Sequence, residues 1–295
     1  MTTIEINGTG GILEGNLEAA AINVNTDPVL DFDGTNDYVH AANHASLNVG
    51  TGDYTLSCWF KTTDTDQKFL MGKGSGGGGG KRYNLYIDSG GELATEIDDD
   101  GTKTSWNGST TVEDGSWHHA ALTVDRNSAT GGQLYLDGHT DGAATNVTSS
   151  QLTLDDTGKK FAIGILSDDE STDAFDGQMA DVRLYKEALS SDDIKILASK
   201  INGDSSLLSA GTTNLSAWWK LNEGTGTSAA DSSANSNTGT ATNFAMSGTS
   251  SNWLFDAFSV NVQDNTTTTD GAVTVTQGKL EGLSLSHLNF DGDAD

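Results

Sequence analysis

The stretch that decides the fold is residues 54–61, which reads Tyr-Thr-Leu-Ser-Cys-Trp-Phe-Lys. Apolar side chains stand at every second position, at Tyr54, Leu56, Cys58 and Phe60. Because successive side chains of a β-strand point to opposite faces, this pattern predicts a strand with one buried face. The same alternation returns later, at Leu134 and Leu136 and then at Phe161, Ile163 and Ile165. Strands and turns at this spacing predict an all-β chain that folds as a sandwich of two antiparallel sheets.

One short helix is expected after residue 189. Ser190 is a favourable N-cap residue, and Asp192 and Asp193 suit the positive end of a helix dipole. Apolar residues then follow at spacings of three and four, namely Ile194, Leu197 and Ile201. They would form one apolar face, so we expect this helix to close one end of the sandwich.

The chain is strongly acidic, with 42 Asp and Glu against 15 Lys and Arg and a net charge of −27. Such a field repels nucleic acids and anionic membranes, so neither is an expected partner. No stretch approaches the roughly 20 apolar residues of a membrane span. Residues 1–6 lack the basic and apolar parts of a secretory signal, so we expect synthesis in a cytoplasm. Cys58 is the only cysteine, which excludes an internal disulfide and a cysteine-based zinc site.

Four stretches, in this order, resemble the laminin-G-like branch of the concanavalin A-like superfamily. They are residues 30–39 (Leu-Asp-Phe-Asp-Gly-Thr-Asn-Asp-Tyr-Val), 54–61, 117–138 (opening Trp-His-His-Ala-Ala-Leu) and 175–190 (opening Phe-Asp-Gly-Gln-Met-Ala-Asp-Val-Arg). Each stretch alone is weak, but their common order is specific. The resemblance implies a jelly-roll sandwich of the concanavalin A-like type, a fold that meets glycans and proteins outside cells.

We expect three parts: an N-terminal β-arm over residues 1–27, a laminin-G-like jelly roll over 28–256 and a C-terminal β-arm over 257–295. A Trp-Lys-Leu strand and an Asp-Ser-Ser turn often open the family's domain, but here they come late, within residues 214–256. That segment either completes the sandwich or begins a second, truncated copy. We favour completion, because about 40 residues cannot bury two sheet faces unaided.

The two ends of the chain resemble other parts of it. Residues 11–15 resemble residues 278–282, and residues 288–292 resemble residues 30–34. This echo suggests matched β-arms, and such arms suit strand addition to a neighbouring copy. A homo-oligomer is therefore expected.

Catalysis has one candidate set, because Glu96, Asp98 and Asp100 alternate as the carboxylates of glucanases with this fold do. A retaining glycosidase needs two carboxylates about 5 Å apart. Residues 98–101, Asp-Asp-Asp-Gly, predict a hairpin turn instead, and the glutamate that the family uses as its acid is missing. The neighbours His118 and His119 would point to opposite faces of a strand, so we interpret them as structural. We therefore expect no enzyme and assign no catalytic, cofactor-binding or metal-binding residue.

Calcium is the one ion that the resemblance implies, since many relatives bind it at loop carboxylates. Candidate ligands are Asp98, Asp99 and Asp100, Asp168 with Asp169, and Asp291 with Asp293. Acidic turns that are simply solvated fit the same pattern. Ala180 also stands where the family often has an aspartate, so no calcium ligand is assigned.

Sugar stacking would need exposed aromatic rings. Trp59 and Trp117 belong to strand patterns and are expected to pack in or against the core. Trp106 and Trp253 lie nearer to turns and could meet a ligand, although packing is favoured for them as well.

The expected function is that of a non-enzymatic virion surface protein, a capsid decoration or fibre component of a bacteriophage. Assembly on a virus and release by lysis would bring a glycan-meeting fold outside the cell without a signal peptide. A single cysteine also fits assembly in a reducing cytoplasm. The expected partners are the major capsid protein or other virion proteins, further copies of the chain, and glycans at the outward jelly roll. The alternatives are a secreted bacterial adhesin or carbohydrate-binding module and, third, a glucanase-like enzyme.

Overall fold

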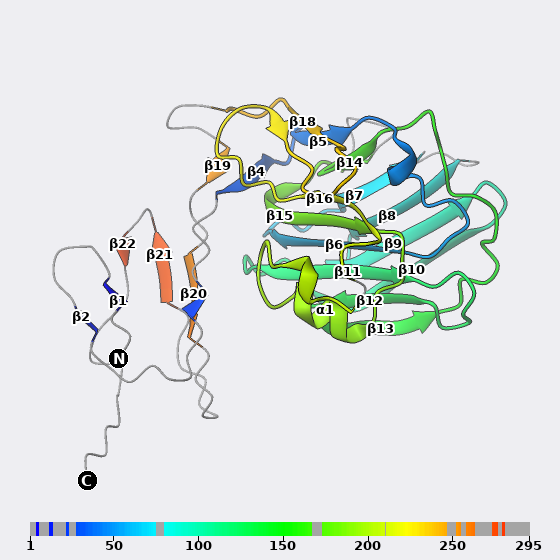
Figure 1. The fold of residues 1–295 in the computed structure, drawn as a ribbon, viewed down its shortest axis with the longest axis horizontal. Coiled ribbons are helices and arrows are strands. Elements are labelled where there is room, and N and C mark those ends of the chain that lie inside the picture. Colours follow the sequence, from blue (N-terminus) through cyan, green and yellow to red (C-terminus); the bar gives the residue numbers. More distant parts are fainter. Residues whose placement is uncertain are drawn as a thin grey trace, which may run out of the picture. The chain divides into compact units, whose positions relative to one another are not determined.

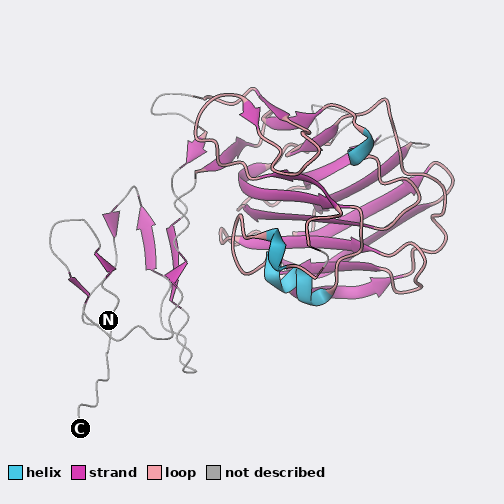
Figure 2. Ribbon diagram, viewed as in Figure 1, coloured by secondary structure: helices cyan, strands magenta, loops and turns pink. Residues whose placement is uncertain are grey.

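The computed structural model describes residues 28–74, 80–166, 173–209, 211–246 and 252–254 in full, together with the backbone of six short strands outside them (Figure 1). The chain divides into two compact units. One unit is Val29–Leu254, and the other consists of the terminal segments Met1–Pro28 and Phe255–Asp295. Strands dominate the larger unit (Figure 2).

The first sheet of the larger unit, named sheet A here, has eight strands. They are β5 (Tyr38–Ala41), β7 (Lys68–Gly74), β8 (Lys81–Ile87), β9 (Glu92–Asp99), β10 (Lys103–Thr111), β14 (Phe161–Ile163), β17 (Ser228–Ala229) and β18 (Gly239–Thr242). Their order across the sheet is β10-β9-β8-β7-β14-β5-β18-β17, and neighbouring strands pair antiparallel.

The second sheet, sheet B, also has eight strands. They are β4 (Val29–Asp33), β6 (Tyr54–Lys61), β11 (His118–Val124), β12 (Gly132–Leu136), β13 (His139–Thr145), β15 (Asp176–Tyr185), β16 (Leu215–Trp219) and β19 (Trp253–Leu254). Their order is β13-β12-β11-β6-β15-β4-β19, with β16 also paired to β15. The two antiparallel sheets confirm the predicted jelly-roll sandwich.

The core lies between the sheets and follows the alternation of the sequence. Tyr54, Leu56, Cys58 and Phe60 on β6 are all fully buried in one apolar cluster, as predicted. Burial raises the pKa of the Cys58 thiol, so this cysteine is a small apolar residue of the core rather than a nucleophile.

The one α-helix, α1 (Ser191–Leu197), begins as the sequence predicts and ends earlier. The Ser190 hydroxyl accepts a hydrogen bond from the Asp193 N–H at 3.2 Å, which completes a capping box. The expectation that the helix includes Ile201 is wrong, because Ala198 caps the helix and the chain turns at Asn202, where φ is +56°. Two 3₁₀ turns complete the helical elements of the described residues, η1 (Ala45–Leu47) and η2 (Ser205–Leu207).

The helix covers the outer face of sheet B rather than an end of the sandwich (Figure 2). Its buried Ile194 and Leu197 belong to a second apolar cluster, together with residues of sheet B and the loops beside it: Ala121, Tyr135, Tyr185, Leu189, Leu208 and Leu215. This cluster removes the outer face of sheet B from solvent over the strands that contribute to it.

Residues 215–254 add strands to both sheets. β16 pairs with β15, β18 with β5, and β19 with β4. Trp219 of β16 is fully buried and stacks on Phe161 at a ring-centroid distance of 5.1 Å. This late segment therefore contributes to the same core as the strands before it.

The smaller unit contains β1 (Ile4–Glu5), β2 (Ile12–Leu13), β3 (Ile22–Asn23), β20 (Phe258–Val262), β21 (Val273–Thr276) and β22 (Lys279–Leu280). β1 pairs with β2, and β3 joins a four-stranded sheet of order β22-β21-β20-β3. Strands from the two ends of the chain are therefore hydrogen-bonded to each other. Among the fully described residues, no helix has the length and apolarity needed to span a membrane.

Candidate functional site

The candidate site lies on the outer face of sheet A, the face turned away from the core. On β8, Tyr83 and Leu85 belong to the core cluster. Arg82, Asn84 and Tyr86 alternate with them and therefore point to the outer face. Arg82 and Asn84 are only 6% and 4% exposed, so a small part of each side chain reaches the surface of this face.

Small residues hollow out this face between its strands. Gly72 of β7 lies opposite Asn84 on one side and opposite Ala162 of β14 on the other. A Cβ atom at Gly72 would stand only 2.6 Å from the Asn84 Cβ, so the position requires glycine. Gly74 adopts a φ of +121° opposite Arg82, a conformation that also favours glycine. The two glycines lie along the floor of a shallow depression on this face.

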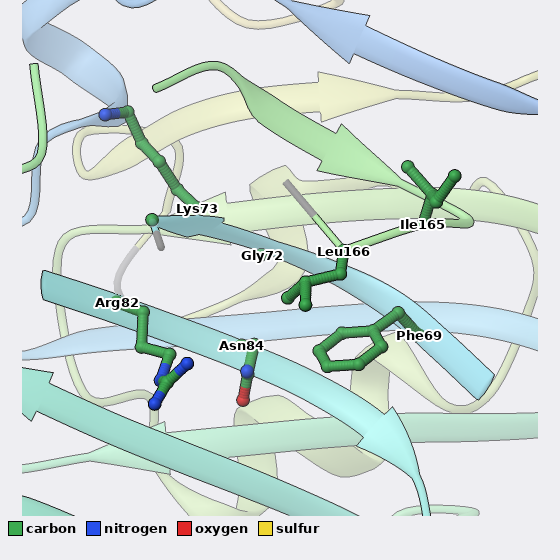
Figure 3. A pocket seen from close by; sticks show the side chains of 8 residues that line it. Phe69, Gly72, Lys73, Arg82, Asn84, Ile165 and Leu166 are labelled. Carbon is green, nitrogen blue, oxygen red and sulfur yellow. The ribbon is translucent and has the colours of Figure 1, made fainter. Parts of the chain in front are cut away.

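The depression has a polar end and an apolar end (Figure 3). Arg82 and Asn84 line the polar end, while Phe69, Ile165 and Leu166 line the apolar end. The Phe69 ring also stacks on Tyr86, with centroids 5.1 Å apart and planes 22° apart. A ligand here would meet carbon and aromatic surface on one side and hydrogen-bonding groups on the other.

The charged groups of the polar end are paired with each other. The Arg82 Nε binds one oxygen of Glu96, and Lys103 binds the other. The Arg82 Nη2 lies 3.6 Å from the Asp98 Oδ2. Arg82 and Glu96 have only 7% and 13% of their side chains exposed, so water screens this pair less than a surface pair. The two cations and two anions balance.

Asn84 is held in a fixed orientation at the centre of this face. Its Oδ1 accepts a hydrogen bond from the Glu96 N–H at 2.8 Å. Its backbone carbonyl accepts a hydrogen bond from the buried Thr95 hydroxyl at 2.7 Å. Within the described residues no group accepts a hydrogen bond from its Nδ2, so that amide can donate to a ligand.

The predicted carboxylate set is only partly assembled. Glu96 and Asp98 share the outer face, as their alternation indicates, but Asp100 lies in the turn between β9 and β10 with φ +67°. The hairpin-turn interpretation of residues 98–101 is therefore right. Both Glu96 oxygens are engaged in ion pairs, which leaves neither free to protonate a leaving group. These ion pairs argue against Glu96 as a general acid.

The two histidines point in different directions and do not form a shared site. The Nδ1 of His118 lies 2.8 Å from the Asp137 Oδ2, and its Nε2 lies 3.2 Å from the Asp114 Oδ1. The hydrogen bond to Asp137 raises the pKa of His118. His119 is fully buried against Trp59, and burial lowers its pKa to about 3. The pair acts as a structural link between strand and turn.

No calcium site assembles in the part of the chain that the structure describes fully, where no three His, Cys, Asp or Glu side chains converge. Asp98 and Asp99 instead accept hydrogen bonds from backbone N–H groups of their own turn, at Asp100 and at Gly101. The other two candidate pairs, Asp168 with Asp169 and Asp291 with Asp293, lie outside the described residues.

Sequence reasoning missed a group of carboxylates on sheet B. Asp31 and Asp33 of β4 lie near Asp37 and Asp176. Burial first, and then neighbouring carboxylates, raise the pKa of Asp31, Asp37 and Asp176. Burial, then the charge of Asp33, raises the pKa of Asp37 to about 6. The Asp37 Oδ2 accepts hydrogen bonds from the Asp33 N–H at 3.1 Å and from the Asn252 Nδ2 at 3.3 Å. The alternation of Asp31 and Asp33 in the sequence was the available indication.

The tryptophans that could have met a ligand are packed, as favoured above. Trp106 and Trp253 are 8% and 3% exposed and belong to the core cluster. Trp59 donates a hydrogen bond from its Nε1 to the Leu197 carbonyl at 3.4 Å, beneath α1. The aromatic surface at the candidate site comes from Phe69 and Tyr86 instead, which the sequence did not single out.

The two sheets define a jelly-roll domain, and comparison with known families identifies the family. The sequence profile described as the concanavalin A-like lectin/glucanases superfamily, laminin-G type, matches residues 33–195. The chain belongs to this family. No curated protein matches the chain significantly.

Solved structures share the fold at low sequence identity. A candidate carbohydrate-binding protein from Bacteroides ovatus aligns over 74% of this chain with 17% identity and a TM-score of 0.56, and the chain spans 58% of that structure. A heptameric SAP-like pentraxin from Limulus polyphemus aligns over 62% of this chain and 86% of its own, with 15% identity and a TM-score of 0.43. The CBM40 of a Ruminococcus gnavus IT-sialidase, bound to α2,3-sialyllactose, aligns over 58% and 96%, with 18% identity and a TM-score of 0.43.

Proposed function

We propose that the protein is a non-catalytic carbohydrate-binding protein whose ligand contacts the outer-face depression of sheet A. The observation that carries the proposal is the glycine-floored depression with Asn84 and Arg82 at one end and Phe69 at the other. The similar Bacteroides ovatus structure is described as a candidate carbohydrate-binding protein, which agrees with the proposal.

The chemistry of the depression matches a sugar ring. A pyranose presents carbon–hydrogen surface on its faces and hydroxyl groups around its edge, so its recognition combines aromatic contact with a few directed hydrogen bonds. Phe69, supported by Tyr86, supplies aromatic surface. Asn84 supplies an oriented amide donor on the same face.

Turnover is not part of the proposal. A glycosidase on this face would need one carboxylate to donate a proton and a second to attack or activate water. Glu96 is engaged by Arg82 and Lys103, and Asp98 lies beside the same guanidinium. We therefore expect binding of glycans without hydrolysis.

The test is a glycan-array screen of the full chain, followed by calorimetric titration of the strongest binder. Asn84→Ala should weaken that binding at least roughly tenfold, because the ligand loses a buried hydrogen bond. Leu207→Ala is the matched control, since it removes a side chain that is 68% exposed beside α1. Equal loss in both variants, or no loss in either, would reject the outer-face depression as the site.

For the biological setting we propose a virion surface, with the smaller unit as the attachment part and the jelly roll outward. The pairing of β3 with β20 supports this, because it joins the two ends of the chain into a β-rich unit of their own. Quantitative mass spectrometry of purified particles should find many copies of the chain. Its recovery only from cell-surface or secreted fractions would favour the alternative, a bacterial adhesin or carbohydrate-binding module.

A further inference from the structure

We propose that Glu96 determines the ligand class of the outer-face depression: by neutralising Arg82, it makes the site select uncharged glycans over carboxylated ones. This inference rests on the proposed function, because it concerns the ligand of the same site. It goes further in naming a specificity-determining residue and the class of sugar.

Arg82 is the group that would otherwise attract an anionic sugar. It lines the polar end of the depression, and a guanidinium binds a carboxylate through two parallel hydrogen bonds. Here Glu96 already binds its Nε, and Asp98 lies 3.6 Å from its Nη2. A sugar carboxylate would therefore meet a guanidinium whose charge two protein carboxylates already offset.

The other cations near the face are engaged as well. Lys103 binds the second oxygen of Glu96. Lys73 also lines the depression, but its side chain points away from Arg82 and Asn84 (Figure 3). Its Nζ donates a hydrogen bond to the carbonyl of Asp156. Among the described residues that line the depression, both cations, Arg82 and Lys73, are therefore already engaged by protein groups.

The charge of the whole chain acts in the same direction. A net charge of −27 lowers the local concentration of anionic ligands around the protein. An anionic sugar would thus meet repulsion at long range and a neutralised guanidinium at short range. A neutral sugar meets neither effect, and Asn84 and Phe69 remain to recognise it.

Removing the Glu96 charge should change the preference without removing the binding face. In Glu96→Gln, Arg82 loses its pairing with the Glu96 carboxylate and keeps the longer contact to Asp98, and Lys103 loses its charged partner. The face then carries one unbalanced positive charge. We expect affinity for carboxylated sugars to rise roughly tenfold, the effect of one charge-assisted hydrogen bond, while affinity for neutral sugars changes less than about threefold.

The experiment measures calorimetric affinities of the full chain for matched trisaccharides. The probes are gluco-, galacto- and manno-configured trisaccharides, each compared with the uronic acid in which C6 is oxidised to a carboxylate. Asp192→Asn is the matched control, because it removes the same charge from an 85% exposed position on α1. Asp98→Asn is a second variant, in case Glu96→Gln is poorly folded by circular dichroism.

For at least one pair, the wild type should bind the neutral trisaccharide at least tenfold more tightly than the corresponding uronic acid. Glu96→Gln or Asp98→Asn should reduce this difference in affinity, whereas Asp192→Asn should leave it unchanged. If the wild type binds uronic acids as tightly as neutral sugars, or more tightly, this inference is overturned and the proposed function remains intact. An unchanged gap in both outer-face variants would also overturn it. Binding of no trisaccharide by the wild type would overturn the inference together with the proposed function.

Discussion

The outer faces of the two sheets differ in what covers them. On sheet B, α1 and the loops beside it bury Tyr135, Tyr185 and Ile194 in an apolar cluster. On sheet A, a smaller apolar cluster of Tyr38, Ala162, Ile165 and Ala174 covers β5 and β14, and beside it lie Gly72 and the ion-paired Arg82 and Glu96. Both sheets contribute one face to the same core. The outer face of sheet B therefore contributes to stability, whereas the outer face of sheet A is the one that we propose for ligand binding.

The largest expected effect is on the covered face. Ile194→Ala should lower the free energy of unfolding by about 2–4 kcal/mol, because it opens a cavity in the fully buried cluster under α1. Urea denaturation monitored by circular dichroism measures this. Glycan affinity under native conditions should be unchanged, and a loss of affinity in folded protein would mean that the two faces are not independent.

The next effect concerns the floor of the depression. Gly72→Ala should abolish measurable glycan binding and lower the free energy of unfolding by about 1–3 kcal/mol, because the new Cβ overlaps Asn84. Gly52→Ala is the control, since its Cβ would meet only the Val49 carbonyl at 3.4 Å. Retained binding in a folded Gly72→Ala protein would contradict the assignment of the site.

A smaller effect, on the pH dependence of stability, is expected at Asp37, whose carboxylate differs in its surroundings from that of Glu96. Glu96 is paired with cations, whereas Asp37, in the loop between β4 and β5, lies near Asp33 and Asp31 and has a pKa of about 6. Because this pKa is raised above its unfolded value, its contribution to stability is fully present below about pH 3.8 and is lost as the pH rises through about 6.

Asp37→Asn should therefore flatten the decline in stability between pH 4 and pH 7, by about 1–2 kcal/mol after solvent screening is allowed for. Denaturation at a series of pH values measures the slope. An Asp37→Asn slope identical to that of the wild type would show that Asp37 is not the titrating group.

The smallest effect concerns the link between His118 and its two aspartates. The pKa of His118 is raised, so its contribution is fully present below about pH 6.5 and fades as the pH rises through its folded pKa. His118→Gln should lower the free energy of unfolding by about 0.5–1 kcal/mol at pH 6 and by less at pH 9. A larger loss at pH 9 than at pH 6 would contradict the charged state of this link.

The sequence predicted the sandwich because its determinant is local: the alternation at Tyr54, Leu56, Cys58 and Phe60 states which face is buried. The start of α1 was predictable for the same reason, since its cap lies at Ser190. Its end was not, because the chain turns at Asn202, where φ is positive and the sequence carries no strong stop before Gly203.

The outer face of sheet A that we propose as the binding face could be predicted only in part. The alternation of Glu96 and Asp98 was visible, but their partner Arg82 depends on the register between β8 and β9. The depression likewise depends on Gly72 lying opposite Asn84 across the β7–β8 hairpin. The sequence alone does not specify such pairings between strands. A shift of the strand register by one residue would turn each of these side chains to the other face of the sheet.

The central claim is that the outer face of sheet A binds the glycan, and amide chemical-shift mapping during titration with the best-bound neutral trisaccharide tests it most directly. We predict that the largest shifts fall in β7, β8 and β14, at Phe69, Gly72, Asn84 and Ala162, with α1 unchanged. Shifts confined to α1 and the strands beneath it would contradict the account.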